Sequence, residues 1–186
     1  MIYIICDLND KTVNVPFVGK ETSLPEGAVP KYVGISKDGH SLAVSLRQKR
    51  IQLMDYDFDT AVIKNDDCYI GWNGSAAMQN WNGKTLTEHL LQQSRGLRTY
   101  LKKGEYVPSL PELAFICTNR DELNVVLEFV GGEQLEASYY WSSTESSHRY
   151  SWYVYFYSGG FKGYYSKYDS YCVRPIIAFD ALSNSR

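Results

Sequence analysis

The most informative part of the chain spans residues 139–179, which read YYWSSTESSHRYSWYVYFYSGGFKGYYSKYDSYCVRPIIAF. Ten of the 16 tyrosines lie in this stretch. Within it, residues 152–157 alternate between apolar side chains and tyrosines, and alternate residues of a β-strand point to opposite faces of the sheet. The pattern predicts a strand with a buried apolar face and an outward tyrosine face. The buried face consists of Trp152, Val154 and Phe156, and the outward face of Tyr153, Tyr155 and Tyr157.

The segment after this strand completes a predicted hairpin. Ser158, Gly159 and Gly160 are typical turn residues, and Phe161 begins a return segment. Tyrosines on such a ribbon offer large contact area at a small cost in side-chain entropy. The pattern favours a binding surface, and the stretch contains no reactive constellation.

Composition and charge exclude several functional classes. The chain has 186 residues, of which 44% are hydrophobic and 22% charged, as in an ordinary soluble globular protein. A net charge of −2 gives no electrostatic case for nucleic acid as a partner. No apolar run is long enough to span a bilayer. The first six residues are apolar but lack a basic n-region, so we expect cytoplasmic synthesis or a signal already removed, and a phage virion or a cell surface as the place of function.

Metal and cofactor chemistry finds no support in the residue spacing. The four cysteines are scattered without a C-x-x-C pair, and free, buried thiols are expected. The histidines His40, His89 and His148 are not at metal-ligand spacing. We therefore expect no metal, no cofactor and no catalytic residue. Glu145 is expected to hydrogen-bond the backbone of its own segment, with a carboxyl of raised pKa as the alternative.

The chain before residue 139 predicts strands and then helices. Residues 2–46 contain β-rich runs, including a hairpin over residues 32–46 with Asp38-Gly39 at its tip. Trp72-Asn73-Gly74 recurs as Trp81-Asn82-Gly83, which predicts two turns pinned by buried tryptophans, with a carbohydrate-stacking pair as the alternative.

Three helix signals follow. Capping boxes at residues 85–88 and 109–112 each predict a helix start, with Glu112 as a cap partner. A periodic run over residues 121–130 predicts a helix that ends at Gly131-Gly132. Segregated strands and helices predict an α+β fold with a mixed, mainly antiparallel sheet and two main helices.

Several segments, taken in order, resemble a bacterial C-type-lectin-like group. That group includes the Fibrobacter succinogenes major paralogous domains and the C-terminal domain of the Legionella collagen-like adhesin. Residues 108–113 (PSLPEL) resemble its helix start, residues 140–145 (YWSSTE) its central segment, and Val173-Arg174-Pro175 its closing motif. The resemblance covers about residues 32–180 and implies a C-type-lectin-like domain over residues 32–186, preceded by an N-terminal strand extension over residues 1–31. Tyr106 and Val107 depart from the group, which usually has a tryptophan before the helix start.

The same resemblance extends to the variable proteins of diversity-generating retroelements. These elements mutate template adenines, mostly in AAY codons, which cannot become Trp, Lys, Glu, Gln or Met. Within residues 146–172 these unreachable types occur only at Trp152, Lys162 and Lys167. The alternative is that tyrosine-rich strands simply suit half-buried surfaces.

The functional hypothesis is a non-enzymatic, receptor- or adhesin-type domain that binds a protein or glycan surface. Two alternatives stay open: an assembly component of a phage tail or pilus tip, and an enzyme related to the formylglycine-generating oxidases. The predicted ligand-binding residues are His148, Arg149, Tyr150, Tyr153, Tyr155, Tyr157, Phe161, Tyr164, Tyr165, Tyr168, Asp169 and Tyr171.

Overall fold

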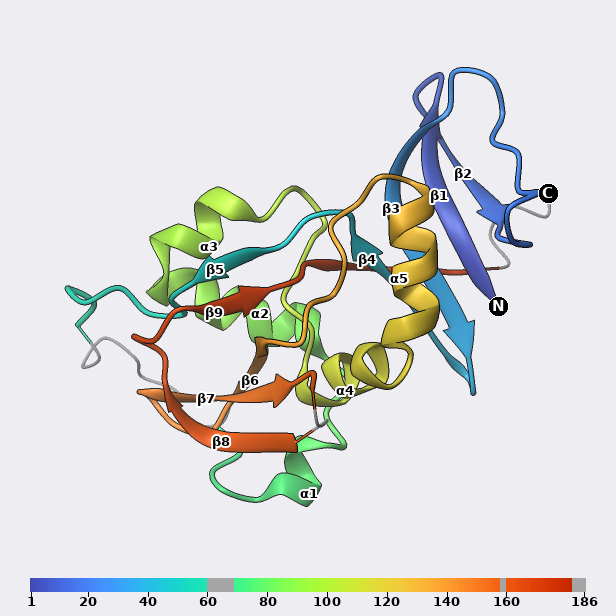
Figure 1. Cartoon of the computed structure of the whole chain (residues 1–186). Helices are drawn as coiled ribbons and strands as arrows, with labels where there is room; N and C mark the ends of the chain where they lie inside the picture. The colour runs from blue at the N-terminus through green and yellow to red at the C-terminus, as the bar shows by residue number, and fades with distance from the viewer. Residues whose placement is uncertain (60–68, 158–159, 182–186) are drawn as a thin grey trace. The chain divides into compact units, whose positions relative to one another are not determined.

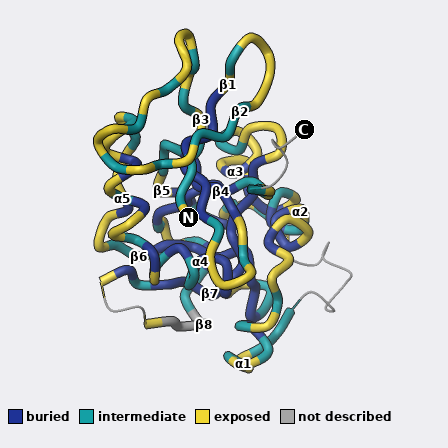
Figure 2. Tube along the Cα trace, turned by 90° about the vertical axis from the view of Figure 1, so that its right-hand side faces the viewer, coloured by how far each residue is buried: buried dark blue, intermediate teal, exposed yellow. Residues whose placement is uncertain are grey.

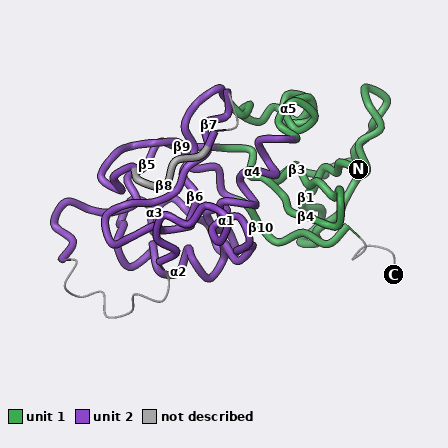
Figure 3. The backbone as a smooth tube through the Cα atoms, turned by 90° about the horizontal axis from the view of Figure 1, so that it is seen from below, with its two compact units in different colours: residues 1–47, 119–135, 176–186 green, residues 48–118, 136–175 purple. Residues whose placement is uncertain are grey.

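The chain forms two compact units, each assembled from segments that are distant in sequence (Figure 3). The computed structural model describes residues 1–59, 69–157 and 160–181, apart from the side chains of residues 161–164. Unit 1 comprises Met1–Arg47, Asn119–Leu135 and Ile176–Arg186, whereas unit 2 comprises Gln48–Thr118 and Glu136–Pro175.

Unit 1 is an antiparallel sheet with one helix against it. The strand order is β10-β4-β3-β1-β2, and each neighbouring pair is antiparallel (Figure 1). The bounds are β1 Ile2–Leu8, β2 Lys11–Pro16, β3 Val29–Lys37, β4 His40–Ser45 and β10 Ile176–Ala178. The helix α5 (Arg120–Phe129) packs against β1 and β3. The boundary predicted between residues 31 and 32 falls within β3.

Local sequence signals in unit 1 are confirmed. The turn between β3 and β4 has φ of 52° at Asp38 and 79° at Gly39, the backbone conformation that a two-residue hairpin turn requires. The helix α5 ends where Gly131 adopts φ of 71° and the Gly132 N–H donates to the Leu127 carbonyl at 2.8 Å. This left-handed glycine is the predicted helix stop.

Unit 2 combines a mixed sheet with four short helices. Its strand order is β5-β9-β6-β7-β8; β6 and β9 pair in parallel, and the other neighbours are antiparallel. The strands are β5 Lys49–Ile51, β6 Tyr139–Glu145, β7 Tyr150–Tyr155, β8 Gly160–Ser166 and β9 Tyr171–Val173. The helices are α1 Gly74–Ala77, α2 Gly83–Gln93, α3 Arg95–Tyr100 and α4 Leu110–Thr118. The helix α2 packs against β6, and α4 packs against β6 and β7. The predicted α+β class, with mainly antiparallel pairing, is confirmed.

The two Asn-Gly pairs start helices instead of forming isolated turns. Asn73 is the N-cap of α1, and its side chain accepts the Ala76 N–H at 3.1 Å. Asn82 is the N-cap of α2, so this helix begins at Gly83 and not at the capping box predicted over residues 85–88. The prediction of buried tryptophans was wrong, because Trp72 is 60% exposed and Trp81 is 39% exposed. Each tryptophan lies outside its helix, one residue before the N-cap, and is therefore not carried into the core by the helix's apolar face.

The second predicted capping signal is confirmed at the start of α4. The Ser109 N–H donates to the Glu112 carboxylate at 2.7 Å, which satisfies a helix-terminal donor in the buried interior. Glu112 is therefore a structural cap partner.

The backbone at Gly83 is so closely surrounded that any side chain at this position would force neighbouring atoms to move. A Cβ atom at this position would overlap the Glu112 carboxylate and would lie 2.6 Å from the Ser109 nitrogen and 2.9 Å from the Val107 carbonyl oxygen. A Cβ atom on Gly74, which also follows an N-cap asparagine, would lie 3.6 Å from Trp152, an ordinary van der Waals contact.

We predict that Gly83→Ala lowers the free energy of unfolding by at least about 2 kcal/mol, because backbone atoms of the segment before α4 must move to admit the methyl group. Denaturant titration followed by circular dichroism measures the change. Gly74→Ala is the matched control and is expected to leave the free energy of unfolding within about 0.5 kcal/mol of the parent value. Equal effects of the two substitutions would contradict the packing argument.

Candidate functional site

The strand β7 is buried on both faces, which only half agrees with the alternation prediction (Figure 2). Trp152, Val154 and Phe156 are buried as predicted, with at most 8% of each residue exposed. The outward orientation predicted for Tyr153 was wrong, because Tyr153 is only 3% exposed. Leu90 from α2 and Leu97 from α3 belong to the same hydrophobic cluster as Tyr153, so apolar side chains of these helices cover this face of the sheet.

Five tyrosines, here called the tyrosine cluster, gather on the Tyr153 face of the sheet: Tyr139, Tyr153, Tyr155, Tyr165 and Tyr171. Ring centroids are 4.4 Å apart for the stacked pair Tyr139–Tyr155 and 4.9 Å apart for the edge-on pair Tyr153–Tyr165. The Tyr165 and Tyr171 rings are 5.3 Å apart. These spacings are those of stabilising aromatic pairs.

The tyrosine cluster is a core with a half-exposed rim. Only Tyr153 is fully buried, and its four partners are half-buried beside it. Burial, together with the neighbouring Tyr165 hydroxyl and the Asp169 charge, raises the pKa of Tyr171 well above its usual range. The residues predicted to bind a ligand include Tyr153, Tyr155, Tyr165 and Tyr171 but not Tyr139, and the prediction placed the buried Tyr153 on the surface.

The remaining predicted tyrosines differ in exposure. Tyr157 is 77% exposed at the end of the segment after β7. Tyr150 is 38% exposed at the opposite end of β7. Phe161 and Tyr164 lie outside the residues whose side chains the structure describes.

A second group of predicted residues meets where β7 begins and β8 ends; we call it the 148–169 surface. It comprises His148, Arg149, Tyr150, Tyr168 and Asp169. Arg149, Tyr150 and Asp169 are exposed, and His148 and Tyr168 are half-buried. The first residues of β7 and the last residues of β8 meet here, because Tyr150 is the register partner of Ser166 in the antiparallel β7–β8 pair.

Two exposed aromatic residues that the prediction did not include extend the 148–169 surface. Trp72, before α1, has its ring 6.0 Å from the Tyr150 ring. Tyr56, which is 76% exposed, stacks on Tyr168 at 5.1 Å with ring planes only 4° apart. Large aromatic side chains with this exposure, next to a charged arginine and aspartate, are typical of the anchors found at binding interfaces.

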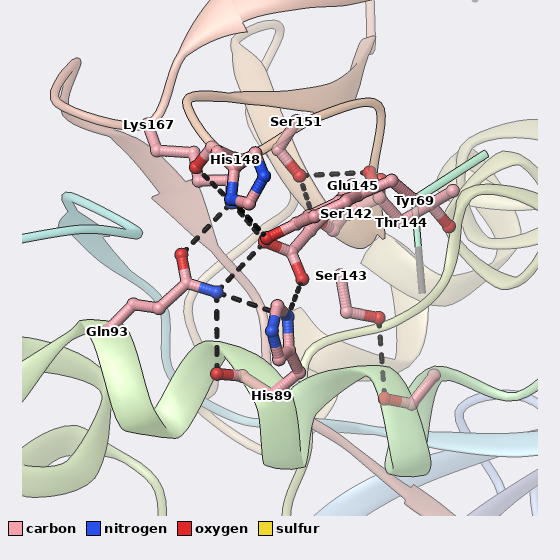
Figure 4. Close-up of polar contacts among 11 residues, drawn as sticks. Tyr69, His89, Gln93, Ser142, Ser143, Thr144, Glu145, His148, Ser151 and Lys167 are labelled. Carbon is pink, nitrogen blue, oxygen red and sulfur yellow. Dashed lines mark hydrogen bonds and ion pairs between the residues drawn. The ribbon is translucent and has the colours of Figure 1, made fainter. Parts of the chain in front are cut away.

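A buried polar network lies beneath this surface, with Glu145 at its centre (Figure 4). The Glu145 and Lys167 side chains are both fully buried and form an ion pair, and the other Glu145 oxygen contacts Nδ1 of His89. Gln93 donates from Nε2 to Glu145 Oε1 at 3.0 Å and accepts from Lys167 Nζ at 3.0 Å. The helix α2 supplies His89 and Gln93, β6 ends with Glu145, and Lys167 follows β8.

The network keeps Glu145 charged. Burial raises the pKa of this carboxyl, but the hydrogen bond with His89 and the positive charge of Lys167 outweigh burial, so the net pKa lies below the ordinary glutamate value. The raised pKa of Glu145 that was the alternative from the sequence is therefore wrong. The prediction that the Glu145 side chain bonds the backbone of its own segment is also wrong, because its partners are the side chains of His89, Gln93 and Lys167. The sequence held no signal that would bring His89, Gln93 and Lys167 to Glu145, because the four residues come from three separate segments.

Lys167 also holds the backbone of the 148–169 surface. Its Nζ donates to the His148 carbonyl at 2.8 Å, and its backbone N–H donates to the Arg149 carbonyl at 2.9 Å. Tyr69 contacts His148 Nδ1 through its hydroxyl at 3.2 Å. The exposed side chains therefore stand on backbone fixed from below, which reduces the entropy lost when they contact a ligand.

A depression of about 410 Å³ lies on unit 2 between β5 and α3, and two of its lining residues, Asp55 and Ser170, directly adjoin Tyr56 and Asp169 in the chain. Lys49, Arg50, Asp55 and Ser170 are among its lining residues, and Arg50 donates to the Ser170 carbonyl at 3.0 Å. The sequence prediction did not include these residues.

The described residues contain no group of three or more His, Cys, Asp or Glu side chains arranged to hold a metal ion. Of the cysteines, Cys6 and Cys172 are buried and Cys117 is half-buried, whereas Cys68 lies outside the described residues. In the same part of the chain, no helix combines the length and the apolar character needed to cross a membrane.

Comparison with known proteins gives no family. No family model matches the chain, and no curated protein matches it. Among solved structures, a fimbrial protein from Bacteroides ovatus is similar, with a TM-score of 0.43 and 19% sequence identity. The match covers 75% of this chain and 36% of the fimbrial protein. This likeness is too weak to define a family, and the class established by the coordinates is an α+β protein with an aromatic core in unit 2.

We predict that Tyr153 and Tyr157, both assigned to the outward face from the sequence, contribute very differently to the free energy of unfolding. Tyr153→Ala should lower the free energy of unfolding by about 3–5 kcal/mol, since it removes the buried centre of the tyrosine cluster. Tyr157→Ala should change it by no more than about 0.5 kcal/mol, because the ring is exposed. Thermal and urea unfolding of the two variants measure the difference. A stable Tyr153→Ala variant would show that the cluster is not a core.

Proposed function

We propose that unit 2 is a non-enzymatic, receptor- or adhesin-type binding module, and that its ligand contacts the 148–169 surface. The observation that carries this proposal is the presence of two aromatic pairs, Trp72–Tyr150 and Tyr56–Tyr168, each with one member on the segments that Lys167 joins. Large aromatic rings are unfavourable in water unless a partner covers them. Exposed rings that gather in one area of a surface therefore indicate an interaction site.

The residues around the rings supply specificity. Arg149 and Asp169 are exposed and of opposite charge, so they offer hydrogen bonds to both acidic and basic groups of a partner. Tyr150 and Tyr168 add hydroxyl groups at the edge of an apolar contact. A protein surface or a glycan, both of which combine apolar patches with hydrogen-bonding groups, fits this arrangement.

The support underneath favours recognition over chemistry. Glu145, the most buried carboxylate of the region, has its hydrogen bonds used by His89, Gln93 and Lys167. Exposed side chains on a backbone that is held in place by buried hydrogen bonds form a preorganised binding surface. For these reasons we propose a role without catalysis on an external substrate.

The finer proposal is a C-type-lectin-like variable protein. It rests on the motif resemblance and on one structural agreement: Trp152 and Lys167, whose types adenine mutagenesis cannot produce, are both buried. Arg149, Tyr150 and Asp169, which are exposed, are all of reachable types. A near-copy of the codons for residues 146–172 beside the gene, together with a reverse transcriptase, is the finding that tests this proposal. A gene neighbourhood without both would contradict it.

We predict that Trp72→Ala combined with Tyr150→Ala lowers affinity at least tenfold while the melting temperature stays unchanged, because exposed anchors contribute to binding and not to the core. Two arrays provide the probes, one of immobilised oligosaccharides and one of purified cell-surface proteins. A probe that binds the parent chain is then titrated against the variant.

Val125→Ala is the matched control, since Val125 is 57% exposed on unit 1 and should leave affinity unchanged. Loss of binding in parallel with loss of thermal stability would contradict the proposal. Dissociation of an oligomer by the double substitution, seen by size-exclusion chromatography, would favour the assembly role instead.

A further inference from the structure

An amine, a carboxamide and a carboxylate meet inside unit 2 with no water-exposed atom among them. Lys167, Gln93 and Glu145 each have 0% exposure. Nζ of Lys167 donates to Oε1 of Gln93 at 3.0 Å, and Glu145 Oε1 accepts from both Lys167 Nζ and Gln93 Nε2. The three groups therefore stand in mutual contact (Figure 4).

We propose that this cluster is a self-modification site at which Lys167 and Gln93 become joined by an isopeptide bond. Nζ of Lys167 attacks Cδ of Gln93, the Nζ–Cδ bond forms, and the Cδ–Nε2 bond breaks. The Gln93 amide nitrogen leaves as ammonia, and no oxidant, reductant or cofactor takes part. The inference does not depend on the proposed binding function.

Glu145 is the catalytic residue of this step, because it touches both the attacking and the leaving nitrogen. Of the three protons on the Lys167 ammonium group, one stays on the new amide and two pass through the Glu145 carboxylate to Nε2. The leaving group carries them away as an ammonium ion, and Glu145 is regenerated as a carboxylate. General acid–base transfer of this kind needs the carboxylate within hydrogen-bond reach of both nitrogens, as it is here.

The reactive state is a transient neutral pair, which the resting ion pair reaches by one proton transfer. An ammonium ion is not a nucleophile, so Lys167 has to lose a proton before it attacks. Transfer of that proton to Glu145 removes two opposite charges from an interior where each is poorly solvated. His89 contacts the other oxygen of Glu145 and so holds the carboxylate in place as a positioning residue.

Attack requires one displacement of the lysine amine, which starts 3.0 Å from the Gln93 carbonyl oxygen. Nζ now lies beside the Gln93 carbonyl oxygen and has to move from that oxygen to the face of the carbonyl carbon. The flexible four-carbon stem of lysine permits this movement while Gln93 stays fixed at the end of α2. The ion-paired arrangement is the state before reaction, and in the product Glu145 keeps His89 as a partner.

The bond would connect the last turn of α2 to the segment that follows β8. That segment carries the backbone contacts of Lys167 with His148 and Arg149, so the cross-link would clamp the 148–169 surface to the helix. A covalent link between residues 93 and 167 also restricts the unfolded chain, as a disulfide does.

Mass spectrometry of the purified full chain tests the proposal directly. We expect the intact mass to be lower than the sequence mass by one ammonia molecule. After trypsin digestion, residues 85–95 should appear joined to a peptide in which the bond after Lys167 is uncut. An intact mass equal to the sequence mass, after prolonged incubation at neutral pH, would overturn the proposal, and so would an ammonia loss that maps to the Asn-Gly pairs.

Three variants complete the test. Lys167→Arg and Glu145→Gln should both abolish the ammonia loss, the first by removing the nucleophile and the second by removing the proton carrier while nearly preserving shape. Gln92→Leu, at the exposed neighbour of Gln93, is the matched control and should retain the cross-link. A cross-linked peptide that persists in Glu145→Gln would contradict the catalytic role assigned to Glu145.

Discussion

The ion pair between Glu145 and Lys167 is the interaction on which the architecture of unit 2 depends. Both side chains are completely buried, and an unpaired charge in that position costs far more than the pair itself contributes. The pair therefore dictates that the end of β6 and the segment after β8 stay together. With His89 and Gln93 it also fixes α2 against β6, so that a helix, a central strand and an edge segment share one polar contact.

Unit 2 is stabilised by an aromatic core, the tyrosine cluster, and by the buried polar network around Glu145. The tyrosine cluster places one buried and four half-buried tyrosines on one face of the sheet, so the core grades into the surface without a sharp boundary. The polar network then supports the opposite end of β7, where the backbone of His148 and Arg149 is held by Lys167. A sheet that is anchored in this way offers both a stable interior and an ordered exposed edge.

Sequence reasoning succeeded where the signal was local. The Asp38-Gly39 turn, the Glu112 cap and the glycine stop after α5 follow from backbone conformation and hydrogen bonding within a few residues. It failed where a distant segment decided the outcome. Tyr153 alternates correctly with its neighbours, but Leu90 of α2 and Leu97 of α3 pack over its face, and alternation alone cannot reveal a covering layer of helices. The partners of Glu145 were equally hidden, since their proximity exists only in the folded chain.

The strand order of unit 1 requires its sheet to be completed late in synthesis. Its sheet begins with β1 at the N-terminus, yet β10, which pairs with β4, arrives only with residues 176–178. During synthesis, β4 therefore presents an open hydrogen-bonding edge until nearly the whole of unit 2 has left the ribosome. Pairing of β4 with β10 is therefore the last step that completes this sheet.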